Sequence, residues 1–244
     1  MTIRYDGKTV IVTGGSQGIG AGIARAFLER NYNVVATSRN ITRSKELPPS
    51  PKLALVDGDI GQASTAARVA ETAIRTFGSI DALVNNAGIF LIKPFLDYTA
   101  EDVDELVSTN LVGFIHLTQF AIRQMLAQKS GGSIVSITAW LADNPIADVN
   151  ASVPMITKGG INAITRSLAM EYAKDHIRVN AVAPGAVDTP LNRNLPADFL
   201  KGLSPMGVIS SIQDIADAVI YLTEAASVTG EVLRVDGGAH VGKW

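Results

Sequence analysis

The chain has 244 residues and a formal net charge of −2, and it contains three histidines and no cysteine. This charge offers no electrostatic basis for binding nucleic acid or an anionic membrane, and the lack of cysteine excludes disulfides and thiolate metal sites. The histidines are too far apart in sequence to suggest a metal centre, so we expect none. Because no apolar run reaches membrane-spanning length and no signal-peptide pattern is present, we expect a cytoplasmic protein.

Short apolar runs alternate with amphipathic stretches, a pattern typical of a parallel sheet covered by helices on both faces. We therefore predict one α/β domain over residues 1–244, doubly wound and of Rossmann type, with about seven parallel strands. The expected strands are Thr9–Thr13, Asn33–Ser38, Leu53–Asp57, Ala82–Asn85, Ser133–Thr138, Arg178–Ala183 and Val232–Asp236. The expected helices are Ile19–Arg30, Ala63–Phe77, Ala100–Gln128, Met155–Asp175 and Ile212–Glu224.

Two irregular segments interrupt this rhythm. Lys45–Lys52 is rich in proline and short, which favours a surface loop rather than a domain linker. Residues 188–206 contain three prolines and form a long connection, so we predict a lid or substrate loop there.

A glycine-rich turn, TGGSQGIG at Thr13–Gly20, follows the first expected strand and opens the first expected helix. Glycines allow a sharp turn close to a pyrophosphate, and the helix directs free N–H groups and its positive dipole end at the anion. A ligand-free strand–helix turn is the alternative. The candidate cofactor-binding residues are Gly14, Ser16, Gln17, Gly18, Ile19 and Gly20.

The second expected strand ends at Ser38, followed by Arg39. In this layout an acidic residue at that place selects the free 2′-hydroxyl of NAD, whereas an arginine accommodates the 2′-phosphate of NADP. The sequence therefore favours NADP(H) over NAD(H), unless Arg39 is an ordinary solvated side chain.

With these elements placed, the chain resembles the classical short-chain dehydrogenase/reductase family over nearly its whole length. The resemblance is carried by the following segments, in chain order: TGGSQGIG, Asp59-Ile60, NNAG at Asn85–Gly88, Asn110 in STNLVG, SIVSIT at Ser133–Thr138, Lys158 in KGG, IRVNAVAPGAVDTP at Ile177–Pro190, and TGEVLRVDGG.

The resemblance implies roles for individual residues. It implies that Lys158 bonds the nicotinamide ribose and that Asn110 positions a water in a proton relay. It also implies cofactor contacts by Asp59 and Ile60 at the adenine, by Asn86, Ala87 and Gly88 at the ribose, and by Pro184, Gly185, Val187 and Thr189 at the nicotinamide. The alternatives are turn capping for Asp59 and an internal hydrogen bond that shapes its helix for Asn110.

One position departs from the family pattern. The family pairs a tyrosine with the lysine four residues later on one helical face, and the tyrosine exchanges the proton. Here Pro154 stands four residues before Lys158, and no tyrosine occurs between Thr99 and Glu171. A proline fits the first turn of a helix, so we expect the helix to start there.

The serine expected after the fifth strand is also replaced. Its place falls on Thr138, which still offers a hydroxyl, or on Ala139, which does not. The segment from there to Pro154 is also longer than is usual for the family, a comparison that depends on the resemblance alone.

Three interpretations follow. The chain is an NADP(H)-dependent oxidoreductase acting on a small, mostly apolar carbonyl substrate, with its proton supplied by Asp143, Asp148, Thr157 or a water relayed from Lys158 and Asn110. It catalyses another reaction in the same cleft, such as reduction of an activated alkene. Or it binds NADP(H) without catalysis, as a sensor or as a subunit of a mixed oligomer. The retained Lys158 favours an enzyme, since folding requires no lysine there.

Other signals concern the substrate and the assembly. Turn formation is the alternative for Asp143 and Asp148, and core packing is the alternative for Trp140 as a pocket wall. The apolar residues of the expected pocket loops favour an apolar small-molecule substrate: Phe90, Ile92, Trp140, Leu141, Leu191 and Met206. The apolar helices Ala100–Gln128 and Met155–Asp175 and the tail Val235–Trp244 resemble segments that pair in the family, so we expect a homodimer or homotetramer.

Overall fold

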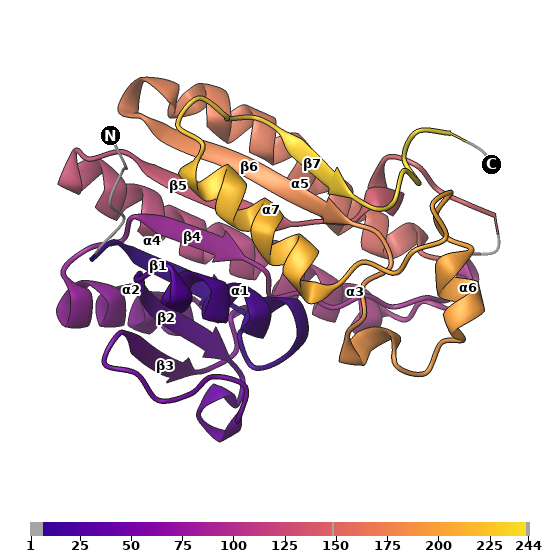
Figure 1. Cartoon of the computed structure of the whole chain (residues 1–244), viewed down its shortest axis with the longest axis horizontal. Helices are drawn as coiled ribbons and strands as arrows, with labels where there is room; N and C mark the ends of the chain where they lie inside the picture. The colour runs from indigo at the N-terminus through magenta and orange to yellow at the C-terminus, as the bar shows by residue number, and fades with distance from the viewer. Residues whose placement is uncertain (1–6, 148, 243–244) are drawn as a thin grey trace.

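The computed structural model describes residues 7–147 and 149–242 (Figure 1). A seven-stranded sheet forms its centre, with every neighbouring pair parallel and the order β3-β2-β1-β4-β5-β6-β7. The strands are β1 (Thr9–Thr13), β2 (Asn33–Ser38), β3 (Leu53–Asp57), β4 (Ala82–Asn85), β5 (Gly132–Ile137), β6 (Ile177–Pro184) and β7 (Val232–Val235). All the predicted strands are therefore confirmed, with ends that differ by no more than one residue.

The α-helices are α1 (Gly18–Glu29), α2 (Ala63–Phe77), α3 (Ala100–Val107), α4 (Gly113–Gln128), α5 (Ser152–Glu171), α6 (Ala197–Lys201) and α7 (Ile212–Glu224). The sequence predicted no helix at α6, which lies inside the expected substrate loop. This helix is only five residues long, too short to show a clear hydrophobic period.

Two predicted helices need correction. The expected helix Ala100–Gln128 is divided by a π-helical turn, Ser108–Val112, which contains Asn110. The expected helix Met155–Asp175 starts earlier, at Ser152, and ends at Glu171. Pro154 is thus the third helical residue rather than the first. It is tolerated there because first-turn N–H groups have no acceptor within the helix.

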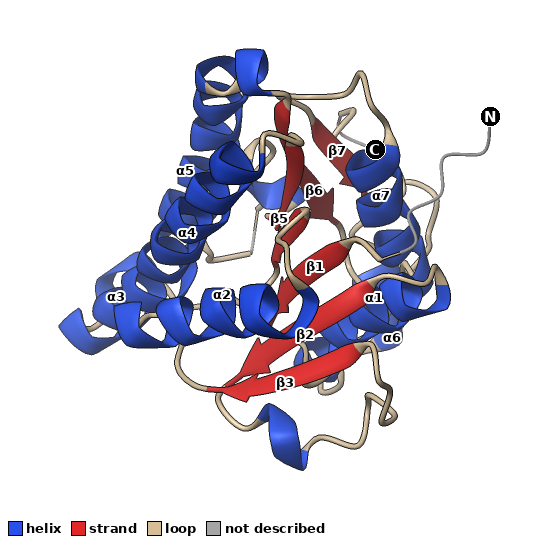
Figure 2. Ribbon diagram, turned by 90° about the vertical axis from the view of Figure 1, so that its left-hand side faces the viewer, coloured by secondary structure: helices blue, strands red, loops and turns tan. Residues whose placement is uncertain are grey.

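Helices cover both faces of the sheet, with α1 and α7 on one side and α2, α4 and α5 on the other (Figure 2). Alternate residues of one strand enter opposite cores: Val10 and Val12 pack with the α1–α7 layer, and Ile11 packs with the α2–α4 layer. This two-sided burial explains why the strands are continuous apolar runs.

The strand order reverses between β1 and β4, since β2 and β3 lie on one side of β1 and β4 to β7 on the other. In open α/β sheets ligands bind at such a switch point, outside the carboxyl ends of the strands. The loops that follow β1, β4, β5 and β6 meet at this edge, which locates the candidate site.

Candidate active site

The glycine turn after β1 brings three chain segments into close contact. Gly14 and Gly18 have φ angles of 69° and 56°, in the left-handed region that favours glycine. A Cβ on Gly14 would lie 2.7 Å from Asn86 Nδ2, and one on Gly20 would lie 2.2 Å from the Gly14 oxygen. Helix α1 starts at Gly18 with no side-chain cap on its N-cap residue, Gln17. Its first N–H groups are therefore directed at the carboxyl edge, where they suit a pyrophosphate.

Thr13 connects this turn to the segment after β4 by hydrogen bonds. Its hydroxyl accepts hydrogen bonds from the backbone N–H of Asn86 (3.0 Å) and of Ala87 (2.9 Å). The Asn86 amide donates to the Thr13 carbonyl oxygen at 2.8 Å. On the other side, Thr189 lies 3.7 Å from the position of a Cβ on Gly18. The structure thus brings together predicted cofactor residues from the loops after β1, β4 and β6.

The rest of the predicted turn and nicotinamide residues line the same edge. Ser16, Ile19 and Gly20 continue the glycine turn into α1, and Ser44 donates to the Ser16 carbonyl at 2.7 Å. Pro184 ends β6, and the N–H of Gly185 donates to the Val235 carbonyl at 2.9 Å. Val187 is buried and forms an isolated parallel bridge with Ser210, which closes the base of the loop 188–206.

The end of β2, where the adenosine is expected, combines cations with a carboxylate that sequence reasoning missed. Ser38 ends β2, and the exposed Arg39 follows it. In register with Ser38 on the next strand is Asp57, which accepts hydrogen bonds from the Thr42 side chain and its N–H. These bonds lower the pKa of the Asp57 carboxyl, assisted by the nearby charge of Arg43. Pairing of Ser38 with Asp57 depends on strand register, so only the fold shows it.

Asp59 and Ile60 follow the end of β3. The Asp59 carboxylate accepts a hydrogen bond from the Gly61 N–H at 3.0 Å, which is the turn-capping arrangement. Ile60 is buried, and a Cβ on Gly113 would approach it to 2.8 Å. Both residues thus have structural contacts of their own.

Lys158, Asn110 and Gly88 converge beside the end of β5. The Lys158 ammonium donates to the Ile137 carbonyl at 2.9 Å, and the residue is only 7% exposed. This burial lowers the pKa of Lys158 from 10.5 to about 8. A Cβ on Gly88 would lie 3.1 Å from Asn110 Oδ1 and 3.2 Å from Lys158 Nζ, so glycine is what allows the three to meet.

The Asn110 side chain is bonded to protein on both of its polar atoms. Its Oδ1 accepts from the Ile89 N–H at 2.9 Å, and its Nδ2 donates to the Ile89 carbonyl and to Thr157 Oγ1, both at 3.0 Å. Thr157 in turn donates to the Pro154 carbonyl at 2.9 Å. The Asn110 amide therefore links the π-helical turn to the segment after β4 and to α5, and the Thr157 hydroxyl is engaged as well.

No tyrosine of the described ranges takes the place that Pro154 occupies. Tyr32, Tyr172 and Tyr221 lie at the opposite, amino edge of the sheet: before β2, before β6 and in the last turns of α7. Tyr98 follows the β4 loop, but its hydroxyl donates to the Leu91 carbonyl at 2.6 Å, and burial raises its pKa. A tyrosine with a raised pKa is a poorer proton donor near neutral pH.

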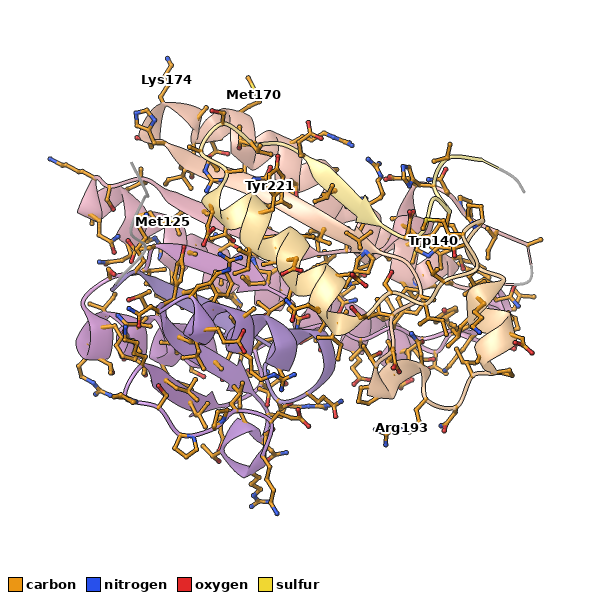
Figure 3. All side chains as sticks on the ribbon, in the orientation of Figure 1. Met125, Trp140, Met170, Lys174, Arg193 and Tyr221 are labelled. Carbon is orange, nitrogen blue, oxygen red and sulfur yellow. The ribbon has the colours of Figure 1, made fainter. Side chains whose placement is uncertain are left out.

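The side chains of the segment after β5 are engaged with protein or buried. The Thr138 hydroxyl donates to the Val182 carbonyl of β6 at 3.3 Å and is buried. Ala139 is extended, and Trp140 begins a 3-10 turn and is only 3% exposed. Figure 3 shows Trp140 beyond the carboxyl end of the sheet. Its burial accords with core packing, the alternative considered for it.

Asp143 is held in an ion pair. Its carboxylate lies 2.7 Å from Arg234 Nη2 of β7 and 3.5 Å from Asn162 Nδ2 of α5. Both carboxylate oxygens of Asp143 are thus engaged with protein side chains. Asp148 lies outside the described residues. Arg234 is separated from Asp143 by 91 positions, so no local sequence signal connects them.

Two further properties of the described ranges bear on the site. Within residues 7–147 and 149–242, no three metal-ligating side chains are clustered. Over the same ranges, no helix is long and apolar enough to span a membrane.

Comparison with known proteins agrees with this geometry. A family model described as "Enoyl-(Acyl carrier protein) reductase" matches residues 14–240. The chain is 34% identical over 235 residues to "Carbonyl reductase family member 4" of Xenopus tropicalis, which covers 96% of this chain and 98% of that protein.

Solved structures are similar over a comparable length. The 3-ketoacyl-(acyl-carrier-protein) reductase of Brucella melitensis, complexed with NADH, has 29% identity and a TM-score of 0.90, covering 96% of this chain and 99% of that one. ElxO with NADP bound has 26% identity and a TM-score of 0.88, with the same shares of the two chains covered. With this sheet order, this glycine turn and these relatives, the chain belongs to the short-chain dehydrogenase/reductase family of oxidoreductases.

Proposed function

We propose that this chain is an NADP(H)-dependent oxidoreductase that reduces a small, mostly apolar carbonyl or activated alkene, with the Lys158 ammonium as its proton donor. The observation that carries the proposal is the place of Lys158: it is buried beside the carboxyl end of β5, where a tyrosine is missing.

The residues at the carboxyl edge suit a dinucleotide. The uncapped start of α1 offers N–H groups to a pyrophosphate, and the close contacts at Gly14 and Gly20 leave the turn no room for larger side chains. When bound, the nicotinamide supplies the hydride. Gly185, Val187 and Thr189 would lie along it, and Lys158 would face its ribose.

The proton then comes from a group whose pKa suits the task. At neutral pH a lysine with a pKa of about 8 is mostly charged, and it gives up its proton more readily than a lysine in water. The developing negative charge on the substrate oxygen would draw the proton from Nζ, and burial favours the neutral amine that remains. Solvent then returns the proton to Lys158.

The NADP preference is supported by charge. Arg39 and Arg43 lie beside the end of β2, and Ser38 replaces the acidic residue that would repel a 2′-phosphate. Asp57 opposes this preference, because its bonds to Thr42 keep its carboxyl charged, and the positive charge of the nearby Arg43 offsets it.

The test compares NADPH oxidation by wild type, Lys158→Ala and the control Lys174→Ala over a panel of ketones, quinones and activated alkenes. Lys174 is exposed and lies in the short turn just beyond the far end of α5 (Figure 3). We expect turnover that falls by about 10²-fold or more in Lys158→Ala only. The turnover of the wild type should decline above about pH 8, where the Lys158 ammonium loses its proton. Equal turnover in all three proteins would refute the role of Lys158.

A second candidate is a protein that binds NADP(H) without catalysis. It is favoured by one observation, that the Thr138 hydroxyl and the Asn110 amide are both engaged with protein atoms. Tight NADPH binding with no turnover on any member of the panel would select it.

We also propose a homodimer or homotetramer with a small-molecule substrate as the further partner. Helices α4 and α5 expose large apolar side chains that association would cover, namely Ile115, Leu126, Ile156 and Met170. Sedimentation equilibrium tests this assembly, and a monomer at all concentrations would refute it.

A further inference from the structure

The turn after β7 contains a buried carboxylate that the proposed reaction does not use. The Asp236 side chain is 1% exposed, and it faces the His240 ring, which is 35% exposed. His240 Nδ1 lies 2.9 Å and 3.0 Å from the two carboxylate oxygens. The same carboxylate accepts the N–H groups of Gly238 and His240, both at 3.0 Å. Without the ring, this buried carboxylate would lose the one side-chain partner that it has among the described residues.

This turn also contacts the end of the substrate loop. Ser204–Val208, where that loop returns to the sheet, packs on Gly237 and Gly238. The Met206 N–H donates to the Gly237 carbonyl at 3.3 Å, and a Cβ on Gly237 would lie 2.9 Å from Ser204 Oγ. A Cβ on Gly238 would lie 3.1 Å from Pro205. Both glycines have positive φ angles, which glycine adopts without strain, so the turn can pass this close to Ser204 and Pro205.

The other face of the turn touches the cofactor side of the cleft. Asp236 lies so close to Gly185 that a Cβ there would come within 2.7 Å of the Asp236 Cα. Asp236 is therefore placed between the end of β6, where the nicotinamide is expected, and the returning end of the substrate loop.

We propose that Asp236 and His240 are positioning residues, which hold Ser204–Val208 against the carboxyl edge and so set the shape of the substrate pocket. The loop's contact with substrate depends on the proposed function, but its anchoring does not.

Limited trypsin digestion of the full chain, without cofactor or substrate, tests the anchoring. Arg193 (Figure 3) and Lys201 are exposed residues of the substrate loop, and Lys45 is an exposed site outside it. In His240→Leu we expect cleavage after Arg193 and Lys201 to be about three to ten times faster. The variant lacks the hydrogen bond between His240 and Asp236, so local opening of the loop should cost less free energy. Cleavage after Lys45 should stay within about twofold of wild type.

Two variants serve as controls. In His240→Asn the amide reaches the place of Nδ1, so cleavage should stay within about twofold of wild type. His116→Leu changes a partly buried histidine on α4, outside this turn, and should also leave the loop protected. Unchanged loop cleavage in His240→Leu would overturn the proposal, as would an equal increase at Lys45.

Kinetics then separate positioning from proton transfer. For a substrate that the wild type reduces, we expect His240→Leu to raise KM about tenfold, with kcat and the Kd for NADPH nearly unchanged. A fall in kcat with unchanged KM and an altered pH profile would make His240 a proton donor and overturn the positioning role. If the chain reduces no member of the panel, the proposed function is refuted. The digestion still tests whether His240 and Asp236 anchor the loop, because it needs no substrate.

Discussion

The ammonium group of Lys158 donates to the carbonyl oxygen of Ile137, 2.9 Å away, at the last residue of β5. This contact places a buried cation at the carboxyl edge of the sheet. Burial lowers its pKa. Desolvation therefore sets the pKa of the group that we propose as the proton donor.

That desolvation predicts a stability effect. The pKa of Lys158 is about 8 in the folded chain, while unfolding restores the ordinary 10.5. Between these values the unfolded state binds more protons, so the free energy of unfolding should rise with pH across that window. We expect Lys158→Met to be about 1–3 kcal/mol more stable than wild type near neutral pH, with the gain shrinking towards pH 10.

Urea unfolding at a series of pH values measures this, with Lys174→Met as the exposed control. A Lys158→Met variant that is less stable than wild type near pH 7 would contradict the prediction, because it would mean that the buried cation contributes to folding.

Arg39→Ala is expected to weaken NADPH binding about tenfold and to leave NADH binding nearly unchanged, because only NADPH carries the 2′-phosphate. Fluorescence titration of both cofactors gives the two affinities, and Arg75→Ala on α2 is the matched control. Equal affinities of the wild type for the two cofactors would rule out the preference itself.

Pro154→Tyr alone is expected to raise carbonyl reduction by less than about tenfold, since a new tyrosine helps little unless a hydroxyl holds the substrate carbonyl beside it. The Thr138 hydroxyl bonds β6, and Ala139 has none to offer. Adding Ala139→Ser should increase the rate further, and steady-state kinetics of both single variants and the double variant check this. A large gain from the proline substitution by itself would show that the substrate is already placed.

Gly20→Ala is expected to destabilise the chain by about 2 kcal/mol or more, because its Cβ would meet the Gly14 oxygen at 2.2 Å. Gly159→Ala is the matched control: nothing lies within 4 Å of the added atom, and it sits within α5. Alanine there should stabilise the chain by about 0.5–1 kcal/mol. Thermal unfolding of the two variants compares them directly, and a Gly20→Ala variant as stable as wild type would show that the turn can relax.

Much of the fold was accessible from local pattern. The strands and the glycine turn were predicted because buried strands are apolar runs and a strand–helix turn against a phosphate needs glycine. The π-helical turn was missed because it depends on contacts of Asn110 with Ile89 and Thr157, which are far away in sequence. Helix α5 starts two residues before Pro154, because a proline is tolerated throughout the first turn and so does not mark the boundary.

The sequence by itself determined the family, the glycine turn and the absence of a tyrosine before Lys158, because each is a matter of residue identity at a fixed spacing. Only the tertiary structure decided that Thr138 faces β6, that Asp143 is paired with Arg234, and that Lys158 is buried enough to lower its pKa. Hydrogen-bond direction, ion pairing and desolvation depend on which distant atoms surround a side chain, and packing alone brings those atoms together.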